Sequence, residues 1–143
     1  MYKRQALGIA QLSRLEELLS KRAAVAELYG NRLGKLEGLI IPQCPAQGRM
    51  SWFVYVVRLS DRFSREDRDS ILRGLKEQGI GCNNYFAPIH LQQHYRNTFG
   101  FKAGDFPITE HTSDRTIALP FHSAITAYQV EQVAACLTEQ IRL

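Results

Sequence analysis

The sequence is poor in cysteine, and its three cysteines, Cys44, Cys82 and Cys136, lie far apart. Because their number is odd and no C-x-x-C pair occurs, neither a disulfide framework nor a zinc site is indicated. The sequence also lacks an apolar run of about 18 residues, the length that spans a membrane, and a signal-peptide pattern at its N-terminus. These absences predict a protein of the reducing cytoplasm that has no membrane partner.

Motifs for several common chemistries are missing as well. Neither of the phosphate-binding patterns G-x-x-x-x-G-K-[ST] and G-x-G-x-x-G occurs, and there is no G-x-S-x-G nucleophile turn. His90 and His94 have the spacing of a zinc-protease helix, but the glutamate that acts as the base in that motif is absent. A thiol nucleophile at Cys82 paired with His90 would require the chain to fold back against its strand direction. We therefore expect no metal site and no catalytic residue of these classes.

Basic residues exceed acidic ones by 18 to 14, which gives a formal net charge of +4. No run of five or six basic residues occurs, so a polyanion-binding tail is not indicated. Trp52, Phe53 and Tyr55 precede Arg58, and such aromatics on a sheet can form a stacking platform for RNA bases. Aromatic residues flanked by valines are more typical of a strand in a core, so we expect no nucleic-acid partner.

The sequence does have a length and a composition that fit one folded domain. It contains 143 residues, of which 45% are apolar, enough to bury a core. Apolar residues at three- and four-residue spacing predict one long helix over residues 6–36. A two-helix hairpin broken near Gly30 is the alternative. Residues 39–50 form a connection, and the β-branched and aromatic segment 51–58 predicts a central strand.

Helix and strand signals continue in the second half of the chain. Ser64 predicts the N-cap of a helix that ends at Gly79, and a strand follows over residues 80–86. This strand–helix–strand order predicts a right-handed crossover, with the strands 51–58 and 80–86 parallel or close together.

Three shorter elements and one long helix complete the expected order. We expect a helix over residues 91–99, a helix that starts at Pro107 with Asp105 as its cap, and a strand over 115–119. A capping box at Thr126–Gln129 opens the last helix. The apolar stripe of that helix comprises Val130, Val133, Ala134, Leu137 and Ile141.

The densest cluster of polar side chains follows Gly79, in the sequence G-I-G-C-N-N-Y-F-A-P-I-H that ends at His90. Asn83, Asn84, Tyr85 and His90 supply two amides, a phenol and an imidazole. These groups both donate and accept hydrogen bonds, which suits a polyhydroxylated ligand such as a sugar. In the structural alternative, one asparagine caps a turn, Tyr85 packs in the core and His90 bonds a backbone carbonyl. We expect these four residues to form part of the wall of a substrate pocket.

Five segments, in order, resemble the C-terminal part of the DegT/StrS sugar aminotransferases and cover essentially the whole chain from Ala6. They are A-L-G-I-A-Q-L (6–12), S-W-F-V-Y-V-V-R-L (51–59), G-I-G-C-N-N-Y-F-A-P-I-H-L-Q (79–92), G-D-F-P (104–107) and T-I-A-L-P-F (116–121). The resemblance implies an α+β fold, the small C-terminal domain of a fold-type-I aminotransferase, with a small, mostly antiparallel sheet covered by helices. It implies a long connecting helix at residues 1–37, truncated at its start, and a small α/β domain at 38–143.

The same resemblance implies an activity for the full-length protein. Members of this family use pyridoxal phosphate to move an amino group, usually from glutamate, onto a keto group of a nucleotide-linked sugar in polysaccharide or glycoside biosynthesis. They typically work as homodimers, and their Schiff-base lysine lies in a large N-terminal domain. None of the five lysines here matches that lysine: Lys3, Lys21, Lys35, Lys76 and Lys102. We therefore expect the chain alone to be inactive and to contribute no cofactor-binding residue.

The resemblance also assigns roles within the polar cluster. Tyr85 and His90 match the family pattern and would orient the sugar. Asn84 stands where many relatives carry a histidine, which implies that it tunes the choice of sugar. The alternative to an aminotransferase fragment is a non-catalytic module that binds a sugar or nucleotide, or that dimerises.

Overall fold

A computed structural model describes residues 2–48 and 50–142 of the chain. Met1, Arg49 and Leu143, which the expected segments 1–37 and 38–143 include, lie outside the described residues. The order of elements is α1 (Tyr2–Ser13), α2 (Leu15–Leu33), β1 (Leu39–Ile40), β2 (Tyr55–Leu59), α3 (Arg65–Glu77), the 3-10 turn η1 (Ile89–Leu91), α4 (Gln93–Phe99), α5 (Pro107–Ser113), β3 (Thr116–Leu119) and α6 (Ala127–Arg142). The fold is α+β, which confirms the predicted class.

The sheet is antiparallel throughout and has the order β1-β2-β3, which confirms the segment around β2 as the central strand. Tyr55 pairs with Leu119 at one end of the β2–β3 ladder. The chain continues from Leu119 into Pro120, whose nitrogen has no hydrogen to donate. The prediction placed the start of this strand at residue 51. In the structure, β2 begins at Tyr55. The two-residue strand β1 was not predicted, because it lies in the segment that we expected to be a connection.

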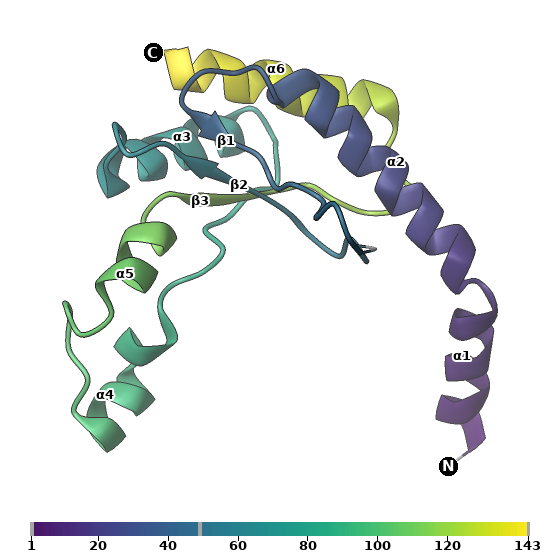
Figure 1. The fold of residues 1–143 in the computed structure, drawn as a ribbon, viewed down its shortest axis with the longest axis horizontal. Coiled ribbons are helices and arrows are strands. Elements are labelled where there is room, and N and C mark those ends of the chain that lie inside the picture. Colours follow the sequence, from purple (N-terminus) through teal and green to yellow (C-terminus); the bar gives the residue numbers. More distant parts are fainter. Residues whose placement is uncertain (1, 49, 143) are drawn as a thin grey trace.

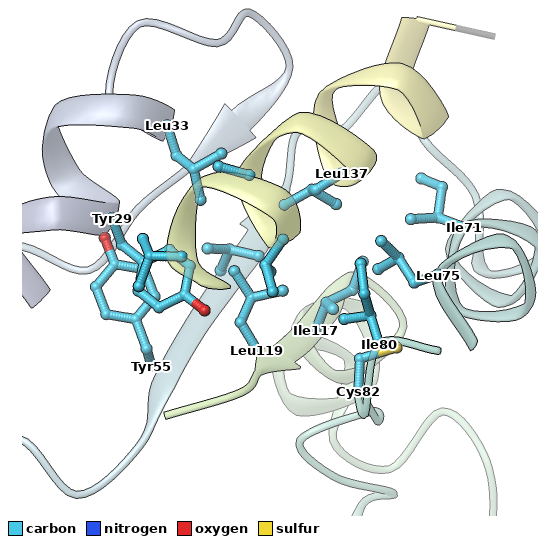
Figure 2. Close-up of a cluster of buried hydrophobic side chains, with 14 of the residues drawn as sticks. Tyr29, Leu33, Tyr55, Ile71, Leu75, Ile80, Cys82, Ile117, Leu119 and Leu137 are labelled. Carbon is cyan, nitrogen blue, oxygen red and sulfur yellow. The ribbon is translucent and has the colours of Figure 1, made fainter. Parts of the chain in front are cut away.

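Helices α2, α3 and α6 share one core with the sheet (Figure 1). Alternate residues of β2, Tyr55, Val57 and Leu59, are buried and face these helices. The ring of Tyr29 on α2 stacks on that of Tyr55 with their centroids 4.8 Å apart, and its hydroxyl donates to the Pro120 carbonyl at 2.8 Å. Figure 2 shows these two rings beside Leu33 and Leu137, where α2 and α6 meet. The core thus joins segments from both ends of the sequence.

Predicted helix ends agree with the structure at three places. Ser64 caps α3 through a capping box with Asp67, and Gly79 follows the helix with a φ of +76°. Thr126 and Gln129 form the second capping box, which opens α6. The predicted apolar stripe of α6 is buried along its whole length: Val130, Val133, Ala134, Leu137 and Ile141.

The single helix predicted over residues 6–36 is two helices, which are separated at Arg14. The Ser13 hydroxyl donates to the Ala10 carbonyl at 2.9 Å, and the Arg14 amide bonds Gln11, three residues back, at 3.2 Å. These contacts tighten the last turn of α1, and a hydroxyl that bonds its own helix in this way bends the chain. In Figure 1, α1 leaves the line of α2, and no residue of α1 is buried. The alternative break near Gly30 is wrong, because α2 runs through Gly30 to Leu33.

The strand predicted over residues 80–86 is also wrong, because this segment makes only one isolated antiparallel bridge, Asn83 to Ala118. Beyond Asn83, the hydroxyls of Thr116 and Ser113 bond the carbonyls of Tyr85 and Phe86 in place of a ladder partner. The segment and β2 both run antiparallel to β3, so they have the same direction, but β3 lies between them. The predicted parallel direction is thus confirmed, although β3 separates the two segments.

The start of α5 corrects one predicted cap. Pro107 is the first residue of the helix, as predicted, but Phe106 and not Asp105 is the N-cap. The Asp105 carboxylate instead accepts from the Lys102 amide at 2.9 Å, within the preceding loop. The carboxylate of Glu110 accepts from the backbone amide of the N-cap residue, Phe106, at 3.3 Å.

Candidate substrate-binding site

Between the end of the Asn83 bridge and β3, residues 84–113 leave the sheet and form a separate lobe that we call the excursion. It contains η1, α4 and α5, which descend from one end of the sheet in Figure 1. The excursion encloses an open hollow of about 640 Å³, within the size range of small-molecule sites. Most of its lining is apolar, and the rings that line it belong to Tyr85, Phe86, His90, Tyr95, Phe101 and Phe106.

Two buried hydroxyls fix the backbone at the start of the excursion. The Thr116 hydroxyl lies 3.1 Å from both the Asn84 side-chain oxygen and the Tyr85 carbonyl. The Ser113 hydroxyl donates to the Phe86 carbonyl at 2.7 Å. The peptide bond between Tyr85 and Phe86 is cis. Because both hydroxyls come from the α5–β3 junction, the first and the last residues of the excursion are tied together.

A buried arginine supports this junction from the core side. Arg68 on α3 is only 2% exposed, and its Nη1 donates to the Ser113 carbonyl at 3.0 Å. Its Nε pairs with Asp69 at 2.8 Å, so the buried guanidinium has an acidic partner. A buried charge of this kind is tolerated only when it is paired and hydrogen-bonded. Arg68 therefore links the core to the wall of the hollow.

His90 lines the hollow and is 7% exposed. Its Nε2 is 3.0 Å from Oε1 of Glu110, and its ring packs on Phe106 with the centroids 4.7 Å apart. Phe101 meets the same ring edge-on at 6.3 Å. The imidazole is thus fixed by one carboxylate and two aromatic rings.

Glu110 collects several donors besides His90. The Gly104 amide donates to both carboxylate oxygens, at 2.9 and 3.0 Å, and the Phe106 amide donates to Oε1 at 3.3 Å. The Gly104 bond is the main cause that lowers the pKa of Glu110 below its ordinary value, and His90 and Phe106 act in the same direction. The ionised carboxylate therefore joins the loop before α5 to His90.

The four predicted site residues divide into two pairs. Tyr85 and His90 line the hollow, whereas Asn83 and Asn84 are not among its lining residues. The side-chain oxygen of Asn83 accepts from the Asn84 amide at 3.0 Å, and that of Asn84 accepts from Thr116. The structure thus brings the phenol and the imidazole together and uses both amides to hold the backbone.

Sequence reasoning missed the residues that hold these groups: Arg68, Glu110, Ser113 and Thr116. They lie 20 to 45 positions from their partners in the sequence, so no local spacing connects them. One signal was available, because Glu110 is an acid in the first turn after Pro107, a common place for a residue that caps the helix.

Other candidate sites have ordinary structural explanations. Within residues 2–48 and 50–142, no three His, Cys, Asp or Glu side chains converge as a metal site would require. The Cys82 thiol lies 3.7 Å from the Leu72 carbonyl, and burial raises the pKa of this thiol. His90, the possible base for Cys82, is paired with Glu110. Tyr55, part of the possible stacking platform, is buried against Tyr29 and so unavailable to a nucleic acid. No helix in the described part of the chain is both long and apolar enough to cross a membrane.

The described residues do not form a pyridoxal-phosphate site by themselves. Such a site needs a lysine to bind the cofactor and a charged partner for its ring nitrogen. All five lysines of the sequence are exposed, and no lysine, arginine, aspartate or glutamate is among the residues that line the hollow. The lining therefore fits a ligand wall and not a cofactor cradle.

Comparison with known proteins places this geometry in a family. The model of the DegT/DnrJ/EryC1/StrS aminotransferase family matches residues 4–138. The chain belongs to this family. The excursion and its hollow are therefore features of a DegT/StrS-type chain, and the predicted resemblance is confirmed.

Two curated relatives show how much of a family member the chain represents. An uncharacterized protein of Methanocaldococcus jannaschii is 35% identical over 120 residues, which are 84% of this chain and 31% of that protein. The spore coat polysaccharide biosynthesis protein SpsC of Bacillus subtilis is 29% identical over 138 residues, 96% of this chain and 36% of SpsC. The chain thus spans about a third of the length of these two relatives.

Solved structures of two aminotransferases, one of them putative, share the fold. The aminotransferase TlmJ of Streptoalloteichus hindustanus has a TM-score of 0.81 and 30% identity, over 94% of this chain and 35% of TlmJ. The putative sugar aminotransferase Spr1654 of Streptococcus pneumoniae has a TM-score of 0.88 and 23% identity. The match covers 95% of this chain and 34% of the Spr1654 chain. The architecture of this chain is thus that of one part of a larger family member.

Proposed function

We propose that this chain forms the C-terminal third of a pyridoxal-phosphate-dependent aminotransferase that acts on a nucleotide-linked keto-sugar, with glutamate as the amino donor. The observation that carries the proposal is the match of the family model to residues 4–138. In this proposal residues 1–37 connect the C-terminal domain, residues 38–143, to the part of the enzyme that holds the cofactor. The enzyme works as a homodimer in the cytoplasm.

The relatives support the chemical class. TlmJ, at 30% identity, is described as an aminotransferase, and SpsC is named for polysaccharide biosynthesis. The five exposed lysines and the absence of charged side chains from the described lining agree with a division of labour. The rest of the enzyme binds the cofactor, whose chemistry is the transfer of the amino group, and this chain shapes the space for the substrate.

Within that division, the side chains of the hollow orient the sugar. The phenol of Tyr85 and the imidazole of His90 meet its hydroxyls, and the aromatic rings cover its apolar face. Asn83 and Asn84, which precede Tyr85 in the chain, contact the same substrate in this proposal. The Thr116 hydroxyl lies 3.1 Å from both the Asn84 side-chain oxygen and the Tyr85 carbonyl, and so positions Asn84 together with Tyr85. Positioning of this kind lowers a reaction barrier, because the reacting groups meet without a further loss of freedom.

A cofactor-binding experiment tests the division of labour. The 143-residue chain is mixed with pyridoxal phosphate, and its absorbance is compared with that of a chimera that joins the N-terminal part of TlmJ to this chain. We expect the absorbance band of lysine-bound cofactor, and its loss on addition of glutamate, from the chimera alone. A stoichiometric band from the chain by itself would show that it carries its own cofactor lysine and would refute the proposal.

A matched variant ties the hollow to the substrate. Tyr85→Phe in the chimera removes only the hydroxyl of the side chain and keeps its ring. The loss of one hydrogen bond of roughly 1.4 kcal/mol is expected to raise the KM for a keto-sugar nucleotide about tenfold. Tyr95→Phe is the control, because Tyr95 also lines the hollow but matches no part of the resemblance. Equal effects of the two variants would remove Tyr85 from the proposed substrate contacts.

A further inference from the structure

We propose that Glu110 is a positioning residue for His90: it holds the proton of the neutral imidazole on Nε2 and leaves Nδ1 as a hydrogen-bond acceptor for a ligand. The claim that this ligand is a sugar rests on the proposed function above. The claim about the proton rests on the bonding of the Glu110 carboxylate and does not depend on the proposed function. The proposal gives Glu110 a part in substrate orientation. This part is not evident from the sequence, because 20 residues separate Glu110 from His90.

The bonding of Glu110 decides which atom donates. Both of its oxygens already accept from the Gly104 amide, and Oε1 also accepts from Phe106, so the carboxylate is surrounded by donors. An ionised carboxylate has no hydrogen of its own, and the lowered pKa of Glu110 keeps it ionised at neutral pH. At 3.0 Å, Nε2 of His90 must therefore be the donor.

The other ring nitrogen remains available. Among the described residues, no hydrogen bond to Nδ1 of His90 is present, and Glu110 is the one ionic partner of this ring. In the part of the chain that the structure describes, the fully buried side-chain nitrogens and oxygens without a hydrogen-bond partner are Nε of Arg22 and Nε of Arg115. Nδ1 of His90 is not among them, so this atom is not fully buried. Because His90 lines the hollow, a molecule in the hollow can reach the ring.

This arrangement selects the chemistry of the ligand. A neutral imidazole with its proton on Nε2 accepts a hydrogen bond at Nδ1, so it favours a hydroxyl or an N–H group and not a phosphate oxygen. Phe101 and Phe106 pack against the ring and supply no competing donor. His90 thus accepts a hydrogen bond from a sugar hydroxyl and does not bind the diphosphate of a nucleotide-linked sugar.

Nitrogen NMR of the 143-residue chain with ¹⁵N-labelled histidine tests the tautomer. The spectrum is recorded near pH 8, above the ordinary imidazole pKa of about 6.5, and His90 is assigned through its contact with the Phe106 ring. We expect one protonated nitrogen, Nε2, and one unprotonated nitrogen, Nδ1. Glu110→Ala should give a mixture of tautomers, and Glu110→Gln should restore the single tautomer, because its amide oxygen can accept from Nε2.

Asp105→Ala is the matched control, because this carboxylate accepts from the Lys102 amide in the same loop and, among the described residues, forms no hydrogen bond or ion pair with His90. It should leave the His90 spectrum as in the wild type, with circular dichroism confirming that all variants are folded. A proton on Nδ1 in the wild type, an unchanged spectrum in Glu110→Ala, or the same change in Asp105→Ala would overturn the proposal.

A ligand titration separates this inference from the proposed function. Uridine diphosphate glucose is the probe, and a shift of the Nδ1 resonance that Glu110→Ala abolishes and Glu110→Gln restores supports both ideas. If the tautomer results hold but the probe leaves Nδ1 unmoved, the positioning role of Glu110 stands and the proposed contact of His90 with the sugar fails.

Discussion

The core and the excursion are held together by different forces. In the core, α2, α3 and α6 bury apolar side chains against one face of the sheet (Figure 2). In the excursion, α4 contains no buried residue and α5 buries only Ser113. A few directed bonds replace apolar burial there: Arg68 to Ser113, Ser113 to Phe86, Thr116 to Tyr85, and His90 to Glu110.

This difference teaches which part can change without unfolding the rest. Full burial of a leucine-sized side chain contributes about 1.5–3 kcal/mol, whereas a net hydrogen bond contributes about 0.5–1.5 kcal/mol. Regions with few buried apolar contacts open locally at a lower free energy than the core. The excursion is therefore the part of the chain whose shape a ligand, or the rest of a larger enzyme, can set.

The largest expected effect is on the core. Leu137→Ala leaves a cavity where α6 meets α2, because Leu137 is 0% exposed, and should lower the free energy of unfolding by about 2–5 kcal/mol. Urea unfolding followed by circular dichroism measures this loss. Tyr128→Ala on the same helix is the control, because Tyr128 is 72% exposed and its loss should stay within about 0.5 kcal/mol. Similar losses for both variants would contradict the assignment of the core.

A smaller effect is expected where the excursion joins the sheet. Thr116→Val keeps the side-chain shape but removes the donor to Asn84 and Tyr85, and should lower the local opening free energy by about 1–2 kcal/mol. Amide hydrogen exchange should then be faster in residues 84–90 and unchanged in α6. Thr138→Val, which removes a hydroxyl bonded within α6, is the control. Unchanged protection of residues 84–90 would show that the hydroxyl does not anchor the excursion.

Acid should affect the excursion with the smallest change in global stability. The pKa of Glu110 is lowered in the folded chain, so its bonds stabilise the loop above the ordinary pKa of 4.5 and are lost as the pH falls through the lowered value. The Gly104 and Phe106 amide resonances should titrate together in that window while the resonances of α2 stay fixed. In Glu110→Gln the two amides should not titrate. A titration that persists in this variant would exclude Glu110 as its source.

Sequence signals predicted best where neighbours in the chain decide the structure. The N-cap at Ser64, the capping box at Thr126–Gln129 and the buried stripe of α6 were predicted correctly because they depend on side chains three or four residues apart. The predicted strand 80–86 failed because hydroxyls from the α5–β3 junction bond its carbonyls. The separation of α1 from α2 was missed because it occurs at Arg14, with no glycine or proline to mark it.

The candidate site was only half predictable for the same reason. Tyr85 and His90 were expected in a pocket wall and line the hollow, while the substrate contacts of Asn83 and Asn84 stay predictions. Phe101 and Phe106 also line the hollow, although the sequence analysis assigned a site role to neither of them. Glu110 could be linked to His90 only in the folded chain, because 20 residues separate them.

The sequence by itself determined both ends of α3, the start of α6, the central strand, the buried stripe of α6 and, through its ordered motifs, the family. Each of these is encoded locally or in a linear order, so no contact between distant residues is needed to find it. Only the tertiary structure decided that Glu110 meets His90 and that the Thr116 hydroxyl bonds Asn84 and Tyr85. Such pairings depend on how α5 returns to the sheet, and side chains that are remote in sequence become partners only when the core has fixed that path.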